Sequence, residues 1–219
     1  MNRVLESELM EDPTQALAYA RADFADVNQG FVDRFRATFP ELTGGSVLDL
    51  GCGPADIPVR LARALPRVHL TAVDGSEAML ALARTAVSRA RLTHRIRLLQ
   101  ARVPGLPLLP KSFDAVISNS LLHHLADPQV FWQELVRLGR PGAAVLVMDL
   151  FRPDSPDRAR EIVEAAAAHE DPILKRDFFS SLLAAWTVDE VRSQLATNLS
   201  RLDCRIVSER HWLVSGRLP

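Results

Sequence analysis

Apolar side chains recur at helical spacing over residues 14–39, and this pattern predicts two helices before Pro40 ends it. The positions that carry the pattern are Leu17, Tyr19, Phe24 and Val27 in the first helix and Phe31, Val32, Phe35 and Phe39 in the second. The period then changes at Ser46–Leu50, a short apolar run that ends in a glycine-rich turn. Such a run is typical of a buried parallel strand, so we expect a sheet to begin here.

Segments with strand and helix patterns alternate from this point to about residue 150. The predicted strands are Ser46–Leu50, His69–Val73, Ile96–Leu99, Phe113–Ser118 and Ala143–Met148. The predicted helices between them are Ile57–Leu65, Ser76–Arg91 and Val130–Leu138. Asp127 is expected to cap the last helix with Pro128 at its first position, and Gly139 with Pro141-Gly142 is expected to end it. The alternation predicts an α/β fold, in which a mostly parallel sheet carries helices on both faces.

The last third of the chain predicts helices followed by two strands. Helices are expected over about 155–168 and 171–186, and Thr187 and Glu190 have the spacing of a capping box that starts another. Arg205–Ser208 and Trp212–Ser215 are expected to add a terminal strand pair, which gives a mixed sheet of about seven strands. We expect one domain over residues 1–219, divided into an N-terminal helical cap at 14–40, a core at 45–150, a helical insertion or lid at 151–200 and terminal strands at 201–219.

Composition excludes several classes of protein. Hydrophobic residues make up 47% and charged residues 24% of the 219, which is typical of a globular chain. The formal net charge of -1 argues against a general nucleic-acid binder, which carries a basic excess. Cys52 and Cys204 stand far apart, so neither a disulfide framework nor a structural zinc site is expected. No apolar run approaches the ~20 residues of a membrane span, and the N-terminus is too acidic for a signal peptide. We expect a cytoplasmic monomer or homodimer without a membrane partner.

Candidate chemistry follows the first two predicted strands. The segment Asp49-Leu50-Gly51-Cys52-Gly53 stands at the carboxyl end of the first strand, where open α/β sheets bind ligands. Gly51 and Gly53 let the backbone approach a ligand with no Cβ in the way, and Asp49 beside them can accept a hydrogen bond from a cation or an amine. Asp74 ends the second strand, and an ionised carboxylate there can accept from both hydroxyls of a ribose.

A glycine-rich turn followed by an acid suits two cofactor classes, and Asp56 distinguishes them. A dinucleotide site has the pattern G-x-G-x-x-G, which opens a helix whose N-terminus holds a pyrophosphate. Asp56 stands at the third glycine position, and its carboxylate would repel a pyrophosphate, as would that of Asp49. A cofactor with no phosphate and with a positively charged sulfur and amine fits better, and S-adenosylmethionine is such a molecule.

Four segments resemble the successive motifs of class I S-adenosylmethionine-dependent methyltransferases: VLDLGCGPA, AVDGSEAML, SFDAVISNSLLHHLADP and RPGAAVLVMDL. The resemblance covers residues 45–150 and, more loosely, the terminal strand pair. It implies a Rossmann-like, seven-stranded, mostly parallel sheet with an antiparallel terminal strand. It also implies S-adenosyl-L-methionine as the cofactor and S-adenosyl-L-homocysteine as the product. The cofactor-binding residues that it implies within these motifs are Asp49, Gly51, Cys52, Gly53, Asp74, Gly75, Met79, Ser118 and Asn119.

Two positions depart from the family's motifs, and an N-terminal segment extends the resemblance. The third glycine of the first motif is Ala55 here, and the acid expected after the third strand is replaced by Gln100. The resemblance still implies that the Gln100 carbonyl accepts from the adenine amine and that the amide of Ala101 donates to the ring. Residues 19 and 27–35 resemble helices that precede the core in a bacterial subgroup, which implies that Tyr19 closes over the cofactor.

The pair His123-His124 falls on the side where this family binds methyl group and substrate. His123 is the candidate general base because histidine titrates near neutral pH; the alternative is one half-buried and one exposed histidine without a chemical role. A metal site would combine the two histidines with Asp127 and Asp149. No metal is expected, because adjacent histidines on a helix point in different directions.

Several charged and aromatic residues of the last third allow two interpretations. Arg152, with Lys175 and Arg176, could clamp an anionic group of a substrate, or these cations could form surface salt bridges. Phe178, Phe179 and Trp186 are expected in the core rather than in an aromatic cage. The thiol of Cys52 is expected to pack within the turn, because nothing beside it would lower its pKa.

The predicted function is methyl transfer to an O, N or C atom of a small molecule by in-line displacement. The enzyme would contribute mainly positioning and desolvation. Two alternatives stay open: a cofactor-binding or interaction module without catalysis, and an NAD(P)-binding oxidoreductase, which Asp56 disfavours. Methylation of nucleic acid is a minor variant, because Asn119-Ser120-Leu121-Leu122 is not the Asn/Asp-Pro-Pro-aromatic motif of enzymes that methylate amino groups of nucleic acids.

Overall fold

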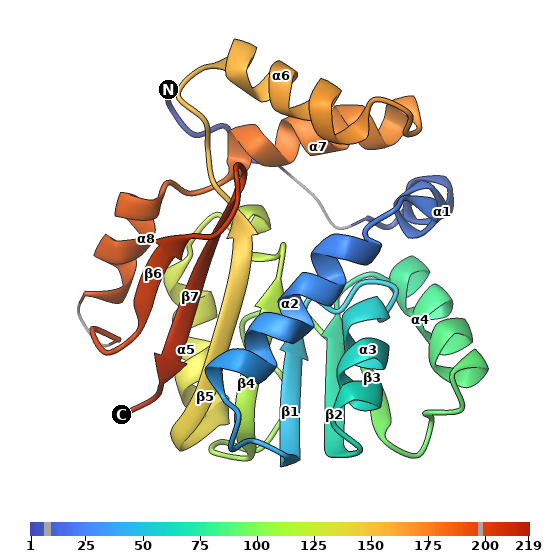
Figure 1. Ribbon diagram of the computed structural model, residues 1–219, viewed down its shortest axis with the longest axis vertical. Helices are drawn as coiled ribbons and strands as arrows, with labels where there is room; N and C mark the ends of the chain where they lie inside the picture. The colour runs from blue at the N-terminus through green and yellow to red at the C-terminus, as the bar shows by residue number, and fades with distance from the viewer. Residues whose placement is uncertain (7–9, 197–198) are drawn as a thin grey trace.

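The computed structural model describes residues 1–6, 10–196 and 199–219, and it shows a seven-stranded sheet between two layers of helices (Figure 1). The strand order is β3-β2-β1-β4-β5-β7-β6. β7 runs antiparallel to β5 and β6, whereas the other neighbouring strands are parallel, so the predicted mostly parallel α/β sheet is confirmed. The strands are β1 (Gly44–Leu50), β2 (Arg67–Asp74), β3 (Ile96–Gln100), β4 (Phe113–Asn119), β5 (Gly139–Leu150), β6 (Asp203–Ile206) and β7 (His211–Arg217).

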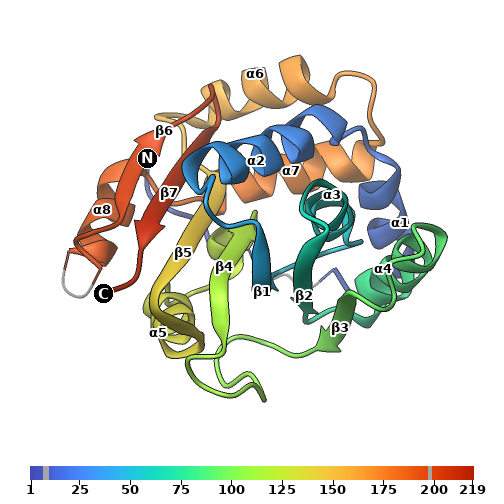
Figure 2. The same cartoon turned by 60° about the horizontal axis from the view of Figure 1, so that its bottom comes forward.

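Helices cover both faces of the sheet (Figure 2), and two apolar clusters, one on each face, hold the layers together. Successive side chains of a strand point to opposite faces, so Val47 belongs to the cluster with α2, α3 and α4, and Leu48 to the cluster with α5 and α8. The helices are α1 (Pro13–Arg21), α2 (Ala25–Thr38), α3 (Asp56–Ala64), α4 (Glu77–Arg89), α5 (Gln129–Leu138), α6 (Pro156–Ala167), α7 (Pro172–Ala184) and α8 (Val188–Leu195), together with the 3₁₀ turn η1 (Leu122–His124).

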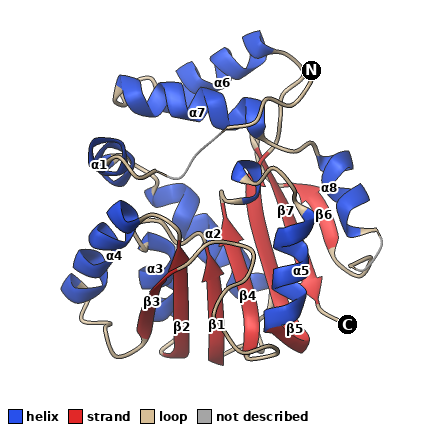
Figure 3. Cartoon of the chain, turned by 180° about the vertical axis from the view of Figure 1, so that it is seen from behind, coloured by secondary structure: helices blue, strands red, loops and turns tan. Residues whose placement is uncertain are grey.

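The carboxyl ends of β1, β2, β4 and β5 lie at one edge of the sheet. After β1 the chain turns to α3 on one face, and after β4 it turns to η1 and α5 on the other face. The two loops therefore diverge between neighbouring strands, which is the arrangement that forms a ligand crevice in open α/β sheets. α6 and α7 lie above this edge (Figure 3).

The structure corrects the bounds of four elements that were expected from the sequence. α5 begins at Gln129 with Pro128 as the N-cap residue, and Asp127 accepts a hydrogen bond from the Gln129 amide at 2.9 Å. β5 begins directly after α5 at Gly139, because Gly139 pairs with Phe113 before the register shifts at a bulge that accommodates Pro141. β6 starts at Asp203 and ends at Ile206, two residues before the expected boundary, and β7 extends to Arg217. The capping box of Thr187 and Glu190 is confirmed.

The N-terminal segment, residues 1–6, packs between α7 and η1, two elements that are far from it in sequence. Arg3 donates hydrogen bonds to the carbonyls of His123 at 2.7 Å and Leu125 at 2.9 Å, and also to the Ala184 carbonyl. Its guanidinium carbon lies 3.9 Å from the ring centre of Trp186, a cation–π contact. These contacts attach the end of α7 to the turn that carries the two histidines.

Arg152 is buried beside this segment and does not face a ligand site. It donates to the carbonyls of Met1 at 3.1 Å and Ala185 at 2.9 Å, and it pairs with Glu190 at 2.6 Å. Of the two interpretations of Arg152, the structure supports ion pairing within the chain rather than an anion clamp, because its donors are satisfied there. Lys175 and Arg176 form ion pairs with Glu164 at 3.3 Å and Asp177 at 3.0 Å.

Among the described residues, no helix has the length and apolar character needed to cross a membrane.

Replacing Arg152 with Met should lower the free energy of unfolding by about 2–4 kcal/mol, because the Glu190 carboxylate and two carbonyls lose a buried partner. Urea unfolding measures the change. The matched control is Arg160→Met, since Arg160 makes an exposed ion pair with Asp157, and its loss should cost at most ~0.5 kcal/mol. Equal effects of the two substitutions would contradict the structural role of Arg152.

Candidate functional site

A cavity of about 610 Å³ opens at the carboxyl edge of the sheet, beneath α7 and beside the N-terminal segment. Cavities of this size hold small molecules and cofactors. Its floor consists of the ends of β1, β2, β4 and β5, and its roof of α1, α6 and α7 with residues 5, 6 and 10. Apolar side chains of the wall include Leu5, Leu150, Leu174 and Phe178. The N-terminal helices and the insertion after β5 thus meet over the sheet.

The loop after β1 forms one end of the cavity. Gly51 has a φ of 75°, and a Cβ at this position would lie 3.0 Å from Leu121, so both the backbone conformation and the space require glycine. Gly53 has a φ of 50° and donates its amide to Asp74 at 2.8 Å. Ala55, which replaces the third glycine, is buried and keeps the left-handed conformation at φ 66°, a strain of about 1 kcal/mol.

Asp74 lines the cavity at the end of β2. Its two oxygens accept from the amides of Gly53 and Ser76, each at 2.8 Å. A carboxylate has about four lone-pair directions, so this side chain can still accept hydrogen bonds from a ligand. Asn119, at the end of β4, also lines the cavity, and its buried Oδ1 has no hydrogen-bond partner in the described part of the chain. Both groups are oriented to receive hydroxyl or amine donors.

Most of the predicted cofactor-binding residues lie on the cavity wall, and four do not. The residues that line it are Tyr19, Gly51, Gly53, Asp74, Gly75, Met79, Ala101 and Asn119. Asp49, Cys52 and Ser118 are buried behind the wall, and Gln100 is exposed beside it. Ser118 donates to the Leu50 carbonyl at 2.7 Å and so joins β4 to β1 below the turn. The three buried residues can act on a ligand only through the loop that they support.

Asp49 is a buried carboxyl immediately below the glycine-rich turn. It lies on the face of β1 that α2 and α3 cover, since side chains alternate along the strand. Burial, with the nearby Asp74 charge as the second cause, raises the pKa of Asp49 to about 8. A cation bound above the turn would favour the ionised form of this carboxyl.

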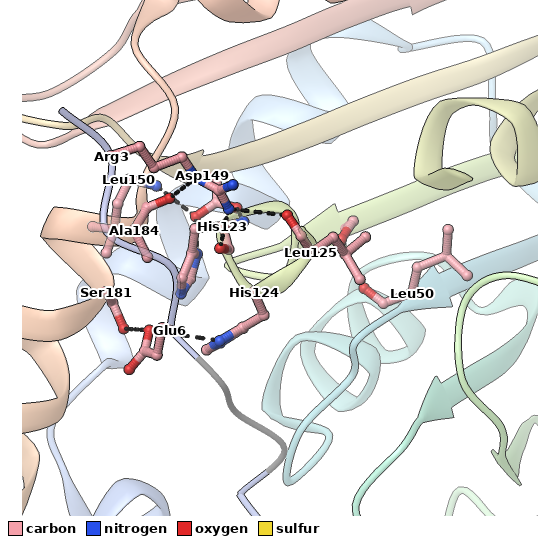
Figure 4. A network of polar contacts seen from close by, with 11 residues as sticks. Arg3, Glu6, Leu50, His123, His124, Leu125, Asp149, Leu150, Ser181 and Ala184 are labelled. Atoms are coloured by element: carbon pink, nitrogen blue, oxygen red, sulfur yellow. Dashed lines mark hydrogen bonds and ion pairs between the residues drawn. The ribbon is translucent and has the colours of Figure 1, made fainter. Parts of the chain in front are cut away.

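His123 is buried at the opposite side of the cavity and is paired with Asp149 at the end of β5 (Figure 4). The Nδ1 of His123 lies 2.6 Å from one Asp149 oxygen, and the His123 amide donates to the other at 3.1 Å. Burial disfavours the charged imidazole, yet the Asp149 carboxylate outweighs it and raises the pKa of His123. The carboxylate fixes the ring, so Nε2 is the nitrogen left to meet a ligand.

His124 and Glu6 stand beside His123 and also line the cavity. The Nδ1 of His124 lies 3.6 Å from Glu6 Oε2, and Ser181 on α7 donates to the same oxygen at 2.9 Å. Burial and the neighbouring His123 lower the pKa of His124 to about 3, so its imidazole is neutral. The polar end of the cavity therefore combines groups from β5, η1, α7 and the N-terminal segment.

The relative orientation of the two histidines differs from the expectation. On a helix, two adjacent histidines would point their rings in different directions. They lie instead at the end of a 3₁₀ turn, and their ring centres are only 4.0 Å apart. Asp149, which the metal hypothesis counted as a ligand, holds His123 from behind, and Asp127 is exposed and bonded to the start of α5.

Charge in the cavity disfavours a pyrophosphate. Asp74 faces the turn, and Asp56 occupies the start of α3, where it accepts from Asn28 at 2.9 Å and Arg60 at 2.7 Å. The helix N-terminus that would hold a phosphate thus already carries its own carboxylate. Arg102 lines the cavity but is paired with Glu11. The wall suits a ligand with hydroxyls and a positive charge.

Several wall residues could not be found by reading the sequence. Glu6, Ser181, Phe178 and Arg210 stand in segments without a recognisable motif, and they reach the site through tertiary packing alone. Phe178 and Phe179 both pack against the small cluster between α6 and α7, and Phe178 also lines the cavity. Helical periodicity marked both as apolar but did not say which one faces a ligand.

Known methyltransferases are similar to this chain both in sequence and in fold. The profile of a methyltransferase domain family matches residues 48–147. An uncharacterised methyltransferase of Mycobacterium bovis is 30% identical over 177 residues, which cover 79% of this chain and 87% of that protein. A SAM-dependent methyltransferase of Aquifex aeolicus has a similar fold, with a TM-score of 0.71 and 17% identity over 95% of this chain and 99% of that chain. The plantazolicin methyltransferase BpumL, solved with a plantazolicin analogue and SAH, gives a TM-score of 0.67 and 13% identity over 94% of this chain and 90% of its own.

The Asp49 carboxyl should make the ligand-free protein less stable as pH rises. The unfolded chain releases this proton near pH 4, whereas the folded chain holds it to about pH 8, so the folded state is increasingly disfavoured between these values. The free energy of unfolding of Asp49→Asn should therefore rise relative to that of the parent protein between about pH 4 and pH 8. Above about pH 8 the difference between the two proteins should stay constant. Urea unfolding at several pH values measures this, with the exposed Asp127→Asn as the control; parallel pH curves for parent and Asp49→Asn would contradict the buried protonated carboxyl.

Proposed function

The chain belongs to the class I S-adenosylmethionine-dependent methyltransferases, and from this premise we propose that its methyl acceptor is a small molecule bound between the glycine-rich turn and His123. The observation that carries the proposal is the buried Asp149–His123 pair, which meets the same cavity as the Gly51–Gly53 turn. The enclosed volume of about 610 Å³ suits a cofactor and a small acceptor together. We infer that the acceptor atom is O, N or C.

The cofactor would occupy the end of the cavity formed by β1, β2 and β4. S-adenosylmethionine, when bound, supplies a methyl group already activated by a positively charged sulfur. Asp74 would accept from the ribose hydroxyls with the lone pairs that Gly53 and Ser76 leave unused. Asn119 would accept an amine at its unpartnered Oδ1, and Asp49 would stabilise positive charge from beneath the turn.

Further residues would enclose the cofactor. Gly75, Met79 and Ala101 would line the adenosine side, and Tyr19 would close it from α1. Tyr19 lies against Phe24, with ring centres 4.8 Å apart, and both side chains face the cavity. Cys52 and Ser118 would support the turn from behind, and Gln100 could reach the adenine only from the exposed rim.

The acceptor would lie between α7 and η1. Leu5, Leu150, Leu174 and Phe178 supply an apolar surface there, and the two histidines supply a polar end. This composition favours an acceptor with an apolar body and one polar group that carries the nucleophile. α7 and the N-terminal segment exclude water, which the reaction needs because water would compete with the acceptor and screen the site.

His123 is the proposed catalytic residue. Its Nδ1 is held by Asp149, so Nε2 is the atom that would take a proton from the acceptor. The bond that forms joins the acceptor to the methyl carbon as the bond from that carbon to sulfur breaks, and the acceptor proton passes to Nε2. Asp149 is a positioning residue, because it fixes the ring without touching the acceptor.

The site favours catalysis over the two alternative functions. A silent binding module has no need for a buried carboxylate that orients a histidine toward the cavity, because such a pair is costly to desolvate. An oxidoreductase would place a pyrophosphate at the start of α3, where Asp56 lies. These observations support methyl transfer to a small molecule.

Asp74→Ala should weaken the binding of S-adenosylmethionine by about 10–100-fold, because two hydrogen bonds to the cofactor and the support of the Gly53 amide are lost. Titration calorimetry measures the affinity. Asp114→Ala, at a carboxylate on the opposite edge of the sheet, should leave it unchanged. Binding of NAD to the parent protein as tight as that of S-adenosylmethionine would refute the cofactor assignment.

His123→Asn should lower kcat by about 10²–10⁴-fold and leave the affinity for S-adenosylmethionine unchanged, since the base is removed from the acceptor side. Transfer of label from methyl-labelled S-adenosylmethionine to a low-molecular-mass cell extract provides the rate. His94→Asn, at an exposed position, is the control. Undiminished label transfer by His123→Asn would remove the residue from the mechanism.

A further inference from the structure

Three side chains at the polar end of the cavity converge in the way that ligands of a metal ion do. One carboxylate oxygen of Glu6 and one ring nitrogen each of His123 and His124 all lie within 4.8 Å of one another. We propose that these three residues bind a divalent transition-metal ion, Zn²⁺ or one of similar preference, at the acceptor side of the cavity. The set corresponds to a two-histidine, one-carboxylate site with positions open to the cavity.

The surroundings of each ligand support this assignment. Asp149 holds Nδ1 of His123 at 2.6 Å, which is the carboxylate–histidine arrangement that orients a metal-binding imidazole and leaves Nε2 as the donor. Nδ1 of His124 is buried and has no hydrogen-bond partner among the residues that the structure describes. Ser181 donates to Glu6 Oε2 at 2.9 Å and so orients the carboxylate. Figure 4 shows the three side chains directed toward the same space.

Metal binding requires the three donor atoms to move closer together. Donor atoms at about 2.0–2.2 Å from a tetrahedral ion lie roughly 3.3–3.6 Å apart, so a separation of up to 4.8 Å must shorten by at most about 1.5 Å. Glu6 is 3.6 Å from His124 already, and its unbranched side chain can supply the remaining movement by rotation. The rings of the histidines are 4.0 Å apart at their centres and need not separate.

The kind of metal follows from the donors. Two imidazoles and one carboxylate suit zinc, cobalt, nickel or iron, whereas magnesium and calcium prefer ligands that are all oxygen. The cavity provides the open side of the site, because Glu6, His123 and His124 all line it. Water or a polar group of a small molecule could complete the coordination from that side.

The metal and the proposed base would compete for one atom. A metal on Nε2 of His123 occupies the nitrogen to which the proposed function assigns the acceptor proton. This consequence rests on the proposed function, and it predicts that a bound transition metal inhibits methyl transfer. Metal binding itself does not depend on the identity of the acceptor.

The first test measures the binding of Zn²⁺ and Co²⁺ to the full chain. Titration calorimetry gives the affinity and stoichiometry, and the visible absorption of the cobalt form reports its coordination. We expect one equivalent to bind, with at least tenfold weaker binding in Glu6→Gln and in His124→Asn. The matched controls are Glu11→Gln, which alters the same N-terminal region at an exposed ion pair, and the exposed His94→Asn; both should bind like the parent.

A measurement without substitutions guards against variants that fold poorly. X-ray absorption of the zinc-loaded parent protein should show two imidazole nitrogens in the coordination shell. No stoichiometric binding, a shell without imidazole, or equal affinity in Glu6→Gln and parent protein would overturn the proposed site.

Zinc added to the label-transfer assay separates the two proposals. Stoichiometric binding with loss of transfer supports the site and its competition with the base. Stoichiometric binding with full transfer upholds the metal site and refutes the assignment of His123 as base. If the parent protein binds no zinc and His123→Asn is inactive, the metal site is refuted and the assignment of His123 as base still stands.

Discussion

The parallel pairing of β1 with both β2 and β4 is the constraint on which the site depends. β1 contacts β2 and β4 through consecutive residues, with Asp49 opposite Ala72 on one side and Ile117 on the other. Parallel strands end at the same edge, so Leu50, Asp74 and Asn119 meet there although they are far apart in sequence. The chain leaves β1 toward one face and β4 toward the other, and the space between these exits becomes the floor of the cavity.

The roof of the cavity depends on a second set of interactions, in which the N-terminal segment is central. Arg3 joins the end of α7 to the carbonyls of the histidine turn, and Arg152 joins Met1 to α7 and α8. Both guanidinium groups donate to backbone carbonyls of segments that are far apart in sequence, which makes this arrangement specific rather than merely compact. The same contacts bring Glu6 to the polar end of the site. The N-terminal segment therefore contacts both α7 in the roof and the turn that carries His123.

The two ends of the cavity differ in their charged groups, which suits methyl transfer from a positively charged donor. Asp74 and Asp49 lie at the turn, where burial raises the pKa of Asp49 to about 8 and a bound cation would favour its ionised form. At the other end Asp149 is committed to His123, and the pair is close to neutral when the imidazole is charged. Under the proposed function, the site separates the stabilisation of the positively charged donor from the handling of the acceptor proton.

The sequence by itself determined the sheet, the order of its elements and the cofactor end of the site. These depend on local signals: the period of apolar residues, the glycines at 51 and 53, and the acid at the end of β2. A glycine with positive φ and a strand-ending acid have the same meaning wherever the fold places them. The cofactor class could be inferred for this reason, and Asp56, together with Asp49 beside the turn, separated it from a dinucleotide.

Only the tertiary structure decided the acceptor end. Asp149 was one of several acids near a strand end until its 2.6 Å contact with His123 gave it a role. Glu6, Ser181 and Phe178 carry no motif and reach the cavity because segments from both ends of the chain pack over the sheet. The resemblance implied a cofactor contact for Gln100, and the place of Arg152 after β5 allowed an anion clamp, but Gln100 is exposed and Arg152 is buried against partners in the chain. Local patterns fix which way a residue faces on its own helix or strand, whereas long-range packing decides what it meets there.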